Sequence, residues 1–201
     1  MKILNEQLSS HEEKLIKEVE ESLHKPVHYC YLNNELSNFG AADYFSNPNF
    51  YTVYSQKGLH GHNFVNNILH ELFHLCQIEE GYPTSSTKNT LITIGEQQYF
   101  NSIGTLSASV ILDLDVNERL LSVGYDSKYF FDYRYQEALD LFYNHSIVYK
   151  DAFENAQLIL NLILMRITDT QEHSNHIFEL YPAILEKSGV AVSFCVERNC
   201  E

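Results

Sequence analysis

The sequence predicts an α+β fold, with a small antiparallel or mixed sheet near the N-terminus and a mainly helical C-terminal half. Two segments rich in β-forming residues, 27–32 and 50–56, lie in the first third of the chain. From residue 63 onward, apolar residues recur at the helical spacings of three and four. A hydrophobic content of 44% in 201 residues is enough for the core of one domain. We therefore expect a single domain over 1–201, with its core at about 26–126 and a helical part at about 127–201.

The first predicted element is a helix over residues 9–24. Ser9 or Ser10 can cap it, and an apolar stripe follows at helical spacing, formed by Leu15, Ile16, Val19 and Leu23. Pro26 ends this helix. Strands are predicted at 27–32 and 50–56, and the turn-prone segment between them has room for a short strand at 42–45.

A second helix is predicted from residue 63 to about residue 80. Its apolar residues are Val65, Ile68, Leu69, Leu72 and Cys76, and Gly81 and Pro83 follow as a helix stop. Later patterns predict helices at 90–112, 115–123, 132–147, 151–168 and 174–187, and a strand at 190–196. These later helices make up the mainly helical C-terminal half.

Charge and hydropathy exclude two classes of partner. The chain has 13 Lys and Arg against 27 Asp and Glu, a formal charge of −14, which argues against nucleic acid and against anionic membranes. Its N-terminus lacks the apolar core of a signal peptide, and no run of 18 apolar residues occurs. We therefore expect a cytoplasmic protein with no nucleic acid and no membrane partner; the oligomeric state is not indicated.

The second predicted helix contains an HExxH motif, His70-Glu71-Leu72-Phe73-His74. Residues four apart lie on one helix face, so the two imidazoles can converge on one metal ion. Glu71 lies one step round the helix, where its carboxylate can reach a water on that metal. Zinc bound by two histidines and one carboxylate keeps a fourth position open for this water.

The stretch 67–75 (NILHELFHL), followed by Gly81-Tyr82-Pro83, resembles the zincin metallopeptidases, in particular the compact IrrE/ImmA-like group. The resemblance implies a zincin-like fold and one Zn²⁺ per chain, with His70 and His74 as ligands and Glu71 as general base on a zinc-bound water. It also implies hydrolysis of peptide bonds in one or few intracellular protein targets, so the expected partner is a protein or peptide substrate. The extended motif HExxHxxGxxH is absent, which argues against a metzincin.

A third metal ligand must come from further along the chain. Asp113 is favoured because it lies in an apolar run, where a buried acid needs a partner such as a metal. Glu96 and Asp115 are alternatives, with a helix N-cap as the other reading of Asp113 or Asp115 and a solvated acid of a first helical turn as that of Glu96. Residues 70–126 hold eight acids and two bases, a balance of 2 − 8 = −6, which favours a divalent cation.

Further candidate site residues lie before and after the predicted metal ligands. Zincin-like hydrolysis often uses a tyrosine to stabilise the oxyanion, and Tyr125, Tyr133 or Tyr135 can serve. His60 and His62 can line the cleft or bind substrate, although a solvated loop also accounts for both. In zincins, a strand such as 50–56 can sit at a sheet edge and pair with a peptide substrate. The alternative to a peptidase is a non-catalytic zincin-fold module that binds metal or protein.

Overall fold

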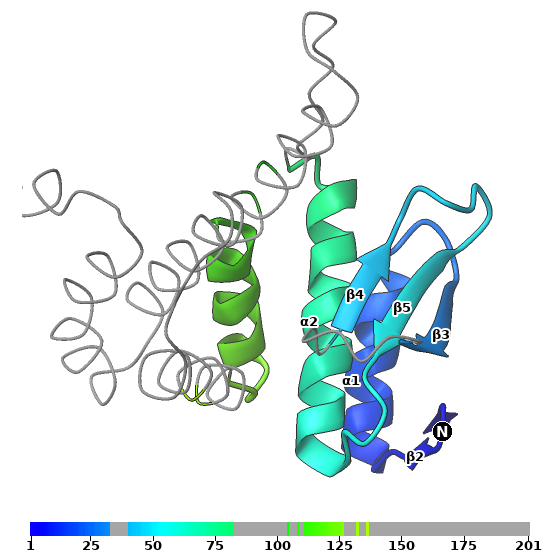
Figure 1. The fold of residues 1–201 in the computed structure, drawn as a ribbon, viewed down its shortest axis with the longest axis vertical. Helices are drawn as coiled ribbons and strands as arrows, with labels where there is room; N and C mark the ends of the chain where they lie inside the picture. Colours follow the sequence, from blue (N-terminus) through cyan, green and yellow to red (C-terminus); the bar gives the residue numbers. More distant parts are fainter. Residues whose placement is uncertain are drawn as a thin grey trace, which may run out of the picture. The chain divides into compact units, whose positions relative to one another are not determined.

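The structure is a computed structural model that describes residues 1–32, 40–82, 104, 108, 111–126, 132 and 136. The chain forms two compact units, Met1–Thr84 with Leu112–Ser127, and Ser85–Ile111 with Lys128–Glu201. Nearly all described residues belong to the first unit, whose elements are coloured in Figure 1. The single domain over 1–201 stays a prediction. Glu96 and the elements predicted at 90–112, 132–147, 151–168, 174–187 and 190–196 lie wholly or mostly outside the described residues.

The first unit combines two small sheets with helices, so the prediction of an α+β fold is confirmed. In chain order, its elements are β1 (Lys2–Ile3), β2 (Glu6–Gln7), α1 (Ser10–Glu21), β3 (Val27–Tyr31), β4 (Gly40–Asp43), β5 (Tyr51–Ser55) and α2 (Gly61–Glu79). Residues 111–122 form a further helix. The antiparallel pair β1–β2 was not predicted, because two-residue strands show no hydrophobic alternation.

The larger sheet is mixed, with strand order β3–β5–β4. β3 pairs with β5 in parallel, with Val27 opposite Tyr51, whereas β4 pairs with β5 antiparallel, with Gly40 opposite Ser55. β5 is therefore central, and the expectation that segment 50–56 lies at a sheet edge is wrong, because partner strands occupy both of its sides. Within the described sheet, the edges are β3 and β4.

Helix α1 begins as predicted. The Ser9 side chain accepts from the backbone N–H of Glu12, and the Glu12 carboxylate accepts from the backbone N–H of Ser9 at 2.7 Å, which is a capping box. Its buried residues are Leu15, Ile16 and Val19, the apolar stripe that the sequence shows. The helix ends at Glu21, five residues before Pro26.

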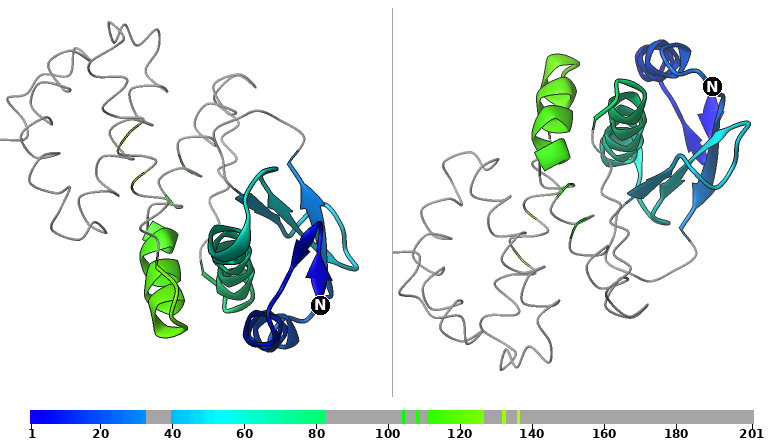
Figure 2. Two further views of the ribbon diagram at one scale, coloured as in Figure 1. Left: turned by 90° about the horizontal axis from the view of Figure 1, so that it is seen from below. Right: turned by 90° about the horizontal axis from the view of Figure 1, so that it is seen from above.

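Helix α2 is the centre of the unit. It contacts β4, β5 and α1, and Figure 2 shows it running beside the sheet. Phe64, Ile68, Leu69, Leu72 and Leu75 are each at most 1% exposed, so this helix supplies much of the core. At its end, Gly81 adopts φ +85° and Tyr82 donates its backbone N–H to the Gln77 carbonyl, a glycine-dependent stop that confirms the prediction from Gly81.

The helix at 111–122 begins before the predicted boundary of 115. Contacts of α2 with this helix and with the residues that follow it run in opposite chain order: Gln77 meets Leu112, His74 meets Asp113, and Asn66 meets Asp126. The two helices are therefore antiparallel neighbours within the unit, as Figures 1 and 2 show. Val116 and Leu120 are buried on this helix.

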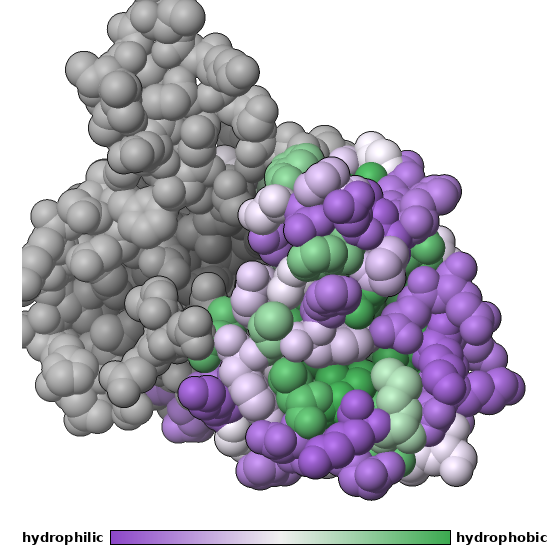
Figure 3. Space-filling view, turned by 90° about the vertical axis from the view of Figure 1, so that its right-hand side faces the viewer, coloured by the Kyte–Doolittle hydropathy of each residue, from purple (hydrophilic) through white to green (hydrophobic). Residues whose placement is uncertain are grey.

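On the face drawn in Figure 3, hydrophilic residues surround a smaller hydrophobic area. Among the described residues, no helix combines the length and the apolar content that crossing a bilayer requires.

Candidate metal centre

The two motif histidines converge because they are one helical turn apart on α2. Nε2 of His70 lies 3.1 Å from Nε2 of His74, and the two rings meet edge to face at an interplanar angle of 82°. Both side chains are partly buried, 21% and 19% exposed. Their neighbours Leu69 and Leu72 are fully buried in the core and hold this stretch of α2 in place.

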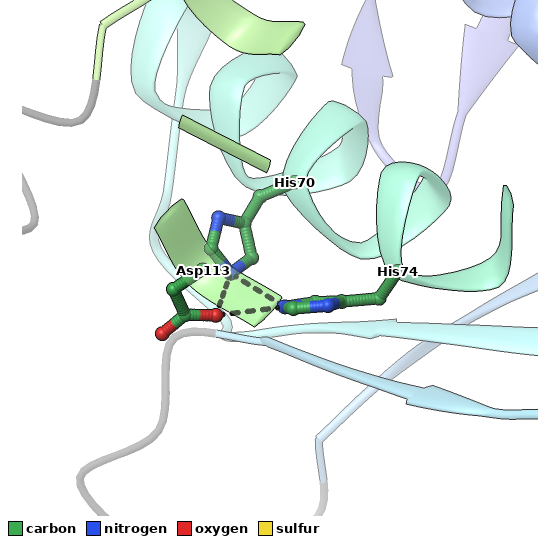
Figure 4. Close-up of side chains that lie close together, drawn as sticks. All are labelled: His70, His74 and Asp113. Atoms are coloured by element: carbon green, nitrogen blue, oxygen red, sulfur yellow. Dashed lines mark hydrogen bonds and ion pairs between the residues drawn. The ribbon is translucent and has the colours of Figure 1, made fainter. Parts of the chain in front are cut away.

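Asp113, on the helix at 111–122, completes a group of three. Its Oδ1 lies 3.0 Å from Nε2 of His74 and 3.6 Å from Nε2 of His70, and Figure 4 shows the three side chains pointing toward one another. An ion held tetrahedrally by bonds of about 2.0–2.1 Å separates its ligand atoms by about 3.3–3.4 Å. The observed separations of 3.0, 3.1 and 3.6 Å bracket that value. The group could therefore hold a metal ion.

The sequence left several readings of the acids after His74 open. Asp113 lies within the helix and faces the histidines, whereas the Asp115 carboxylate accepts from Gln77 and Arg119, each at 2.8 Å. Two residues apart on a helix, the side chains diverge by about 200°. Neither acid is an N-cap, since the helix is already formed at residue 111. Metal binding by Asp113 itself stays a prediction.

The side chain of Glu71 extends from α2 toward Gly40 of β4, and this residue is only 6% exposed. Burial raises its pKa to about 7, with Asp113 raising and His74 lowering that value. A Cβ built on Gly40 of β4 would lie 2.6 Å from Oε1 of Glu71 and 2.8 Å from Oδ1 of Asn67. The backbone at Gly40 therefore packs directly against this carboxylate.

The surroundings shift the pKa values of the two histidines in opposite directions. Burial, together with repulsion from His74, lowers the pKa of His70 to about 4. Burial alone would lower the pKa of His74, but the hydrogen bond with Asp113 and the charges of Glu71 and Asp113 raise it to about 9.

Gln77, which sequence reasoning missed, contacts His74 at Nδ1, the ring nitrogen that faces away from Asp113. It is fully buried, and its Oε1 lies 3.0 Å from Nδ1 of His74. Its Nε2 donates to the Leu112 carbonyl and to Oδ2 of Asp115, both at 2.8 Å. The available signal was its position: a polar residue three after His74, on the same helix face.

His62 and Tyr125 lie together, at the other end of α2. Their rings stack with centroids 4.6 Å apart and an interplanar angle of 8°. His62 is inside α2 and not in a loop, eight residues and thus about 12 Å of helix before His70. The oxyanion role of Tyr125 and the substrate role of His62 stay predictions, and this placement gives them no support.

Comparisons with known protein families, with curated proteins and with solved structures find no match to this sequence. His70, His74 and Asp113 therefore define a candidate metal site on their geometry alone.

Proposed function

We propose that this protein is a zinc-dependent metallopeptidase of the zincin type. The observation that carries the proposal is the approach of Asp113 Oδ1 to Nε2 of both motif histidines. Two imidazoles and one carboxylate are the donor types of catalytic zinc sites, which leave a fourth position open. His70, His74 and Asp113 would hold the ion, one per chain.

The reaction would divide between the ion and Glu71. Bound zinc lowers the pKa of a water molecule toward neutral and polarises a carbonyl. Glu71 follows His70 directly and is buried beside the proposed metal ligands, where a carboxylate can accept a proton and return it. Glu71 would take the proton from the attacking water and deliver it to the departing amine.

A peptide substrate is supported by the position of β4. This strand is an edge of the described sheet, and its first residue, Gly40, touches the Glu71 carboxylate. Backbone groups on a sheet edge can pair with an extended peptide. A peptide added beside β4 would place a scissile bond near Glu71, whereas β5 has no edge to offer. As the resemblance implies, we expect one or few intracellular protein targets.

The decisive variant is Glu71→Gln, which keeps the shape of the side chain but removes its basicity. We expect zinc to stay at about one per chain and hydrolysis to fall about 10²–10⁴-fold, as for loss of a general base. Zinc is measured by elemental analysis after dialysis, and cleavage by identifying new peptide N-termini in a proteome digest. Glu79→Gln, the same change on the same helix, is the matched control and should keep activity.

Two further results distinguish a zinc peptidase from a non-catalytic binding module. Asp113→Asn and His74→Ala should lose zinc and hydrolysis together. If wild type binds zinc but yields the same set of N-termini as Glu71→Gln, the peptidase proposal is wrong and the protein is a non-catalytic metal- or protein-binding module.

A further inference from the structure

We propose that Gln77 is a positioning residue of the metal centre: its side-chain amide fixes the orientation of His74 and holds the Asp113 helix in register with α2. The inference rests on the proposed function only in requiring that the group of His70, His74 and Asp113 binds zinc. It does not require that the protein hydrolyses peptides.

The amide of Gln77 has a single workable orientation. Two of its contacts, the Leu112 carbonyl and the Asp115 carboxylate, can only accept hydrogen bonds, so the NH₂ group must face them. Oε1 must then face His74, and Nδ1 of His74 must be the donor in that contact. A flipped amide would set oxygen against oxygen at 2.8 Å.

This orientation decides which nitrogen of His74 can meet a metal. With Nδ1 protonated and donating to Gln77, the lone pair of the neutral ring lies on Nε2. Nε2 is the atom that faces Asp113 Oδ1 and Nε2 of His70. Ligand histidines are commonly held by a hydrogen bond on the nitrogen away from the metal, and losing it typically costs 10–100-fold in metal affinity.

The same amide sets the position of the third ligand. The Leu112 carbonyl belongs to the peptide group that joins Leu112 to Asp113, so the bond from Gln77 fixes the backbone next to that carboxylate. The bond to Asp115 extends the contact one residue further. Arg119 then links Asp115 to Glu80, the residue that follows the end of α2, and this closes a ring of side chains between the two helices.

Burial makes these bonds costly to lose. Gln77 is 0% exposed, and the other α2 residues at 2% or less are apolar. A buried amide without partners costs about 1–3 kcal/mol, so an amide is tolerated here because all three contacts are made. Packing alone would be served equally by leucine or methionine.

The test uses Gln77→Leu and Gln77→Glu in the full chain. Leucine removes every contact, whereas glutamate can still accept from His74 but cannot donate to Leu112 and Asp115. The matched control is Asn66→Leu: Asn66 is another buried amide of α2, and it donates to the Asp126 carbonyl, beyond the metal group. Two quantities are measured: the zinc dissociation constant, by competition with a chelating indicator, and the His74 Nδ1 proton resonance of the zinc-loaded protein.

We expect Gln77→Leu to weaken zinc binding about 10–100-fold and to shift the Nδ1 proton upfield, with faster exchange. Gln77→Glu should keep that resonance downfield yet still bind zinc less tightly, because the Asp113 helix loses its register. Asn66→Leu should lower stability while changing neither quantity. If Gln77→Leu does not fold, Gln77→Glu still tests the register through the dissociation constant.

Wild-type affinity and an unshifted proton in Gln77→Leu, or wild-type affinity in Gln77→Glu, would overturn the inference, even if wild type is an active peptidase. Conversely, if wild type shows no hydrolysis but the variants behave as expected, the positioning role stands and only the proposed function fails.

Discussion

Gly40 leaves the space that the Glu71 carboxylate occupies. Its φ is not in the left-handed region, so the requirement for glycine here is the missing Cβ and not the backbone conformation. The atoms nearest to a built Cβ belong to Glu71 and Asn67, both side chains of α2. A larger residue would therefore act first on the proposed general base.

We predict that Gly40→Ala lowers hydrolysis at least about 10-fold while zinc binding is kept. The added methyl would lie 2.6 Å from Glu71 Oε1 and displace that carboxylate from its place beside the metal group. Cleavage rate and zinc content are measured as for Glu71→Gln. Ala41→Ser is the control, since neighbouring strand residues point to opposite faces. An active Gly40→Ala enzyme would show that Glu71 has room to move.

The residues of the site differ in how far the sequence predicted them. His70, Glu71 and His74 follow from one motif with helical spacing, and Asp113 from its position in an apolar run. The apolar run favoured Asp113 but left Asp115 open, and the helix phase that separates the two was not supplied by the predicted boundary at 115. Gln77 and Gly40 carry no motif, because their importance lies in contacts with segments 35 and 31 residues away along the chain.

The two helices of the site are also joined by charged side chains. Arg119 donates to Glu80 through both terminal nitrogens, at 2.8 and 2.6 Å, and to Asp115 through Nε at 2.8 Å. The hydrogen bond with Arg119 is the main cause that lowers the pKa of Glu80. A two-pronged contact of this kind is stronger than an ordinary surface pair.

We predict that Arg119→Met lowers the free energy of unfolding by about 1 kcal/mol at neutral pH. Because the folded pKa of Glu80 is depressed, the pair stabilises above the unfolded pKa near 4.5 and is lost as pH falls through the lower folded value. The difference between variant and wild type should therefore shrink below pH 4.5 in urea titrations. Lys14→Met, which breaks an exposed pair on α1, should cost less. A pH-independent difference would contradict the role of Glu80.

Local signals predicted the elements of the sheet and of α1 and α2 well. The Ser9 capping box, the β-rich segments and the Gly81 stop depend on residues close in sequence. The bounds of β4 depend on residues far away in the sequence. This strand was expected at 42–45 and lies at Gly40–Asp43, because pairing with β5 determines where it starts. For the same reason, the central place of β5 could not be predicted from its own residues.

Bound metal would join distant parts of the chain, because two ligands lie on α2 and the third lies on the helix at 111–122. Zinc held there would stabilise only the folded state, by about 2.7 kcal/mol when free zinc is 100 times its dissociation constant. Removing zinc should thus release the link between α2 and the helix at 111–122.

We predict that a chelator lowers the melting temperature of the zinc-loaded protein by about 5–10 °C. Asp113→Asn should melt at one temperature with or without chelator, whereas His11→Ala, at an exposed histidine on α1, should respond like wild type. Calorimetric scans with and without zinc measure both. An Asp113→Asn protein that still responds to zinc would place the stabilising ion elsewhere.

The separation of the ligands along the chain also has a consequence during synthesis. Asp113 follows His74 by 113 − 74 = 39 residues. At about 5–20 residues per second, a ribosome makes that stretch in about 2–8 s. For this interval the nascent chain carries both imidazoles and Glu71 but lacks the third metal ligand. Zinc binding by all three ligands, and with it any hydrolysis of peptides, would therefore wait until the helix at 111–122 has been translated.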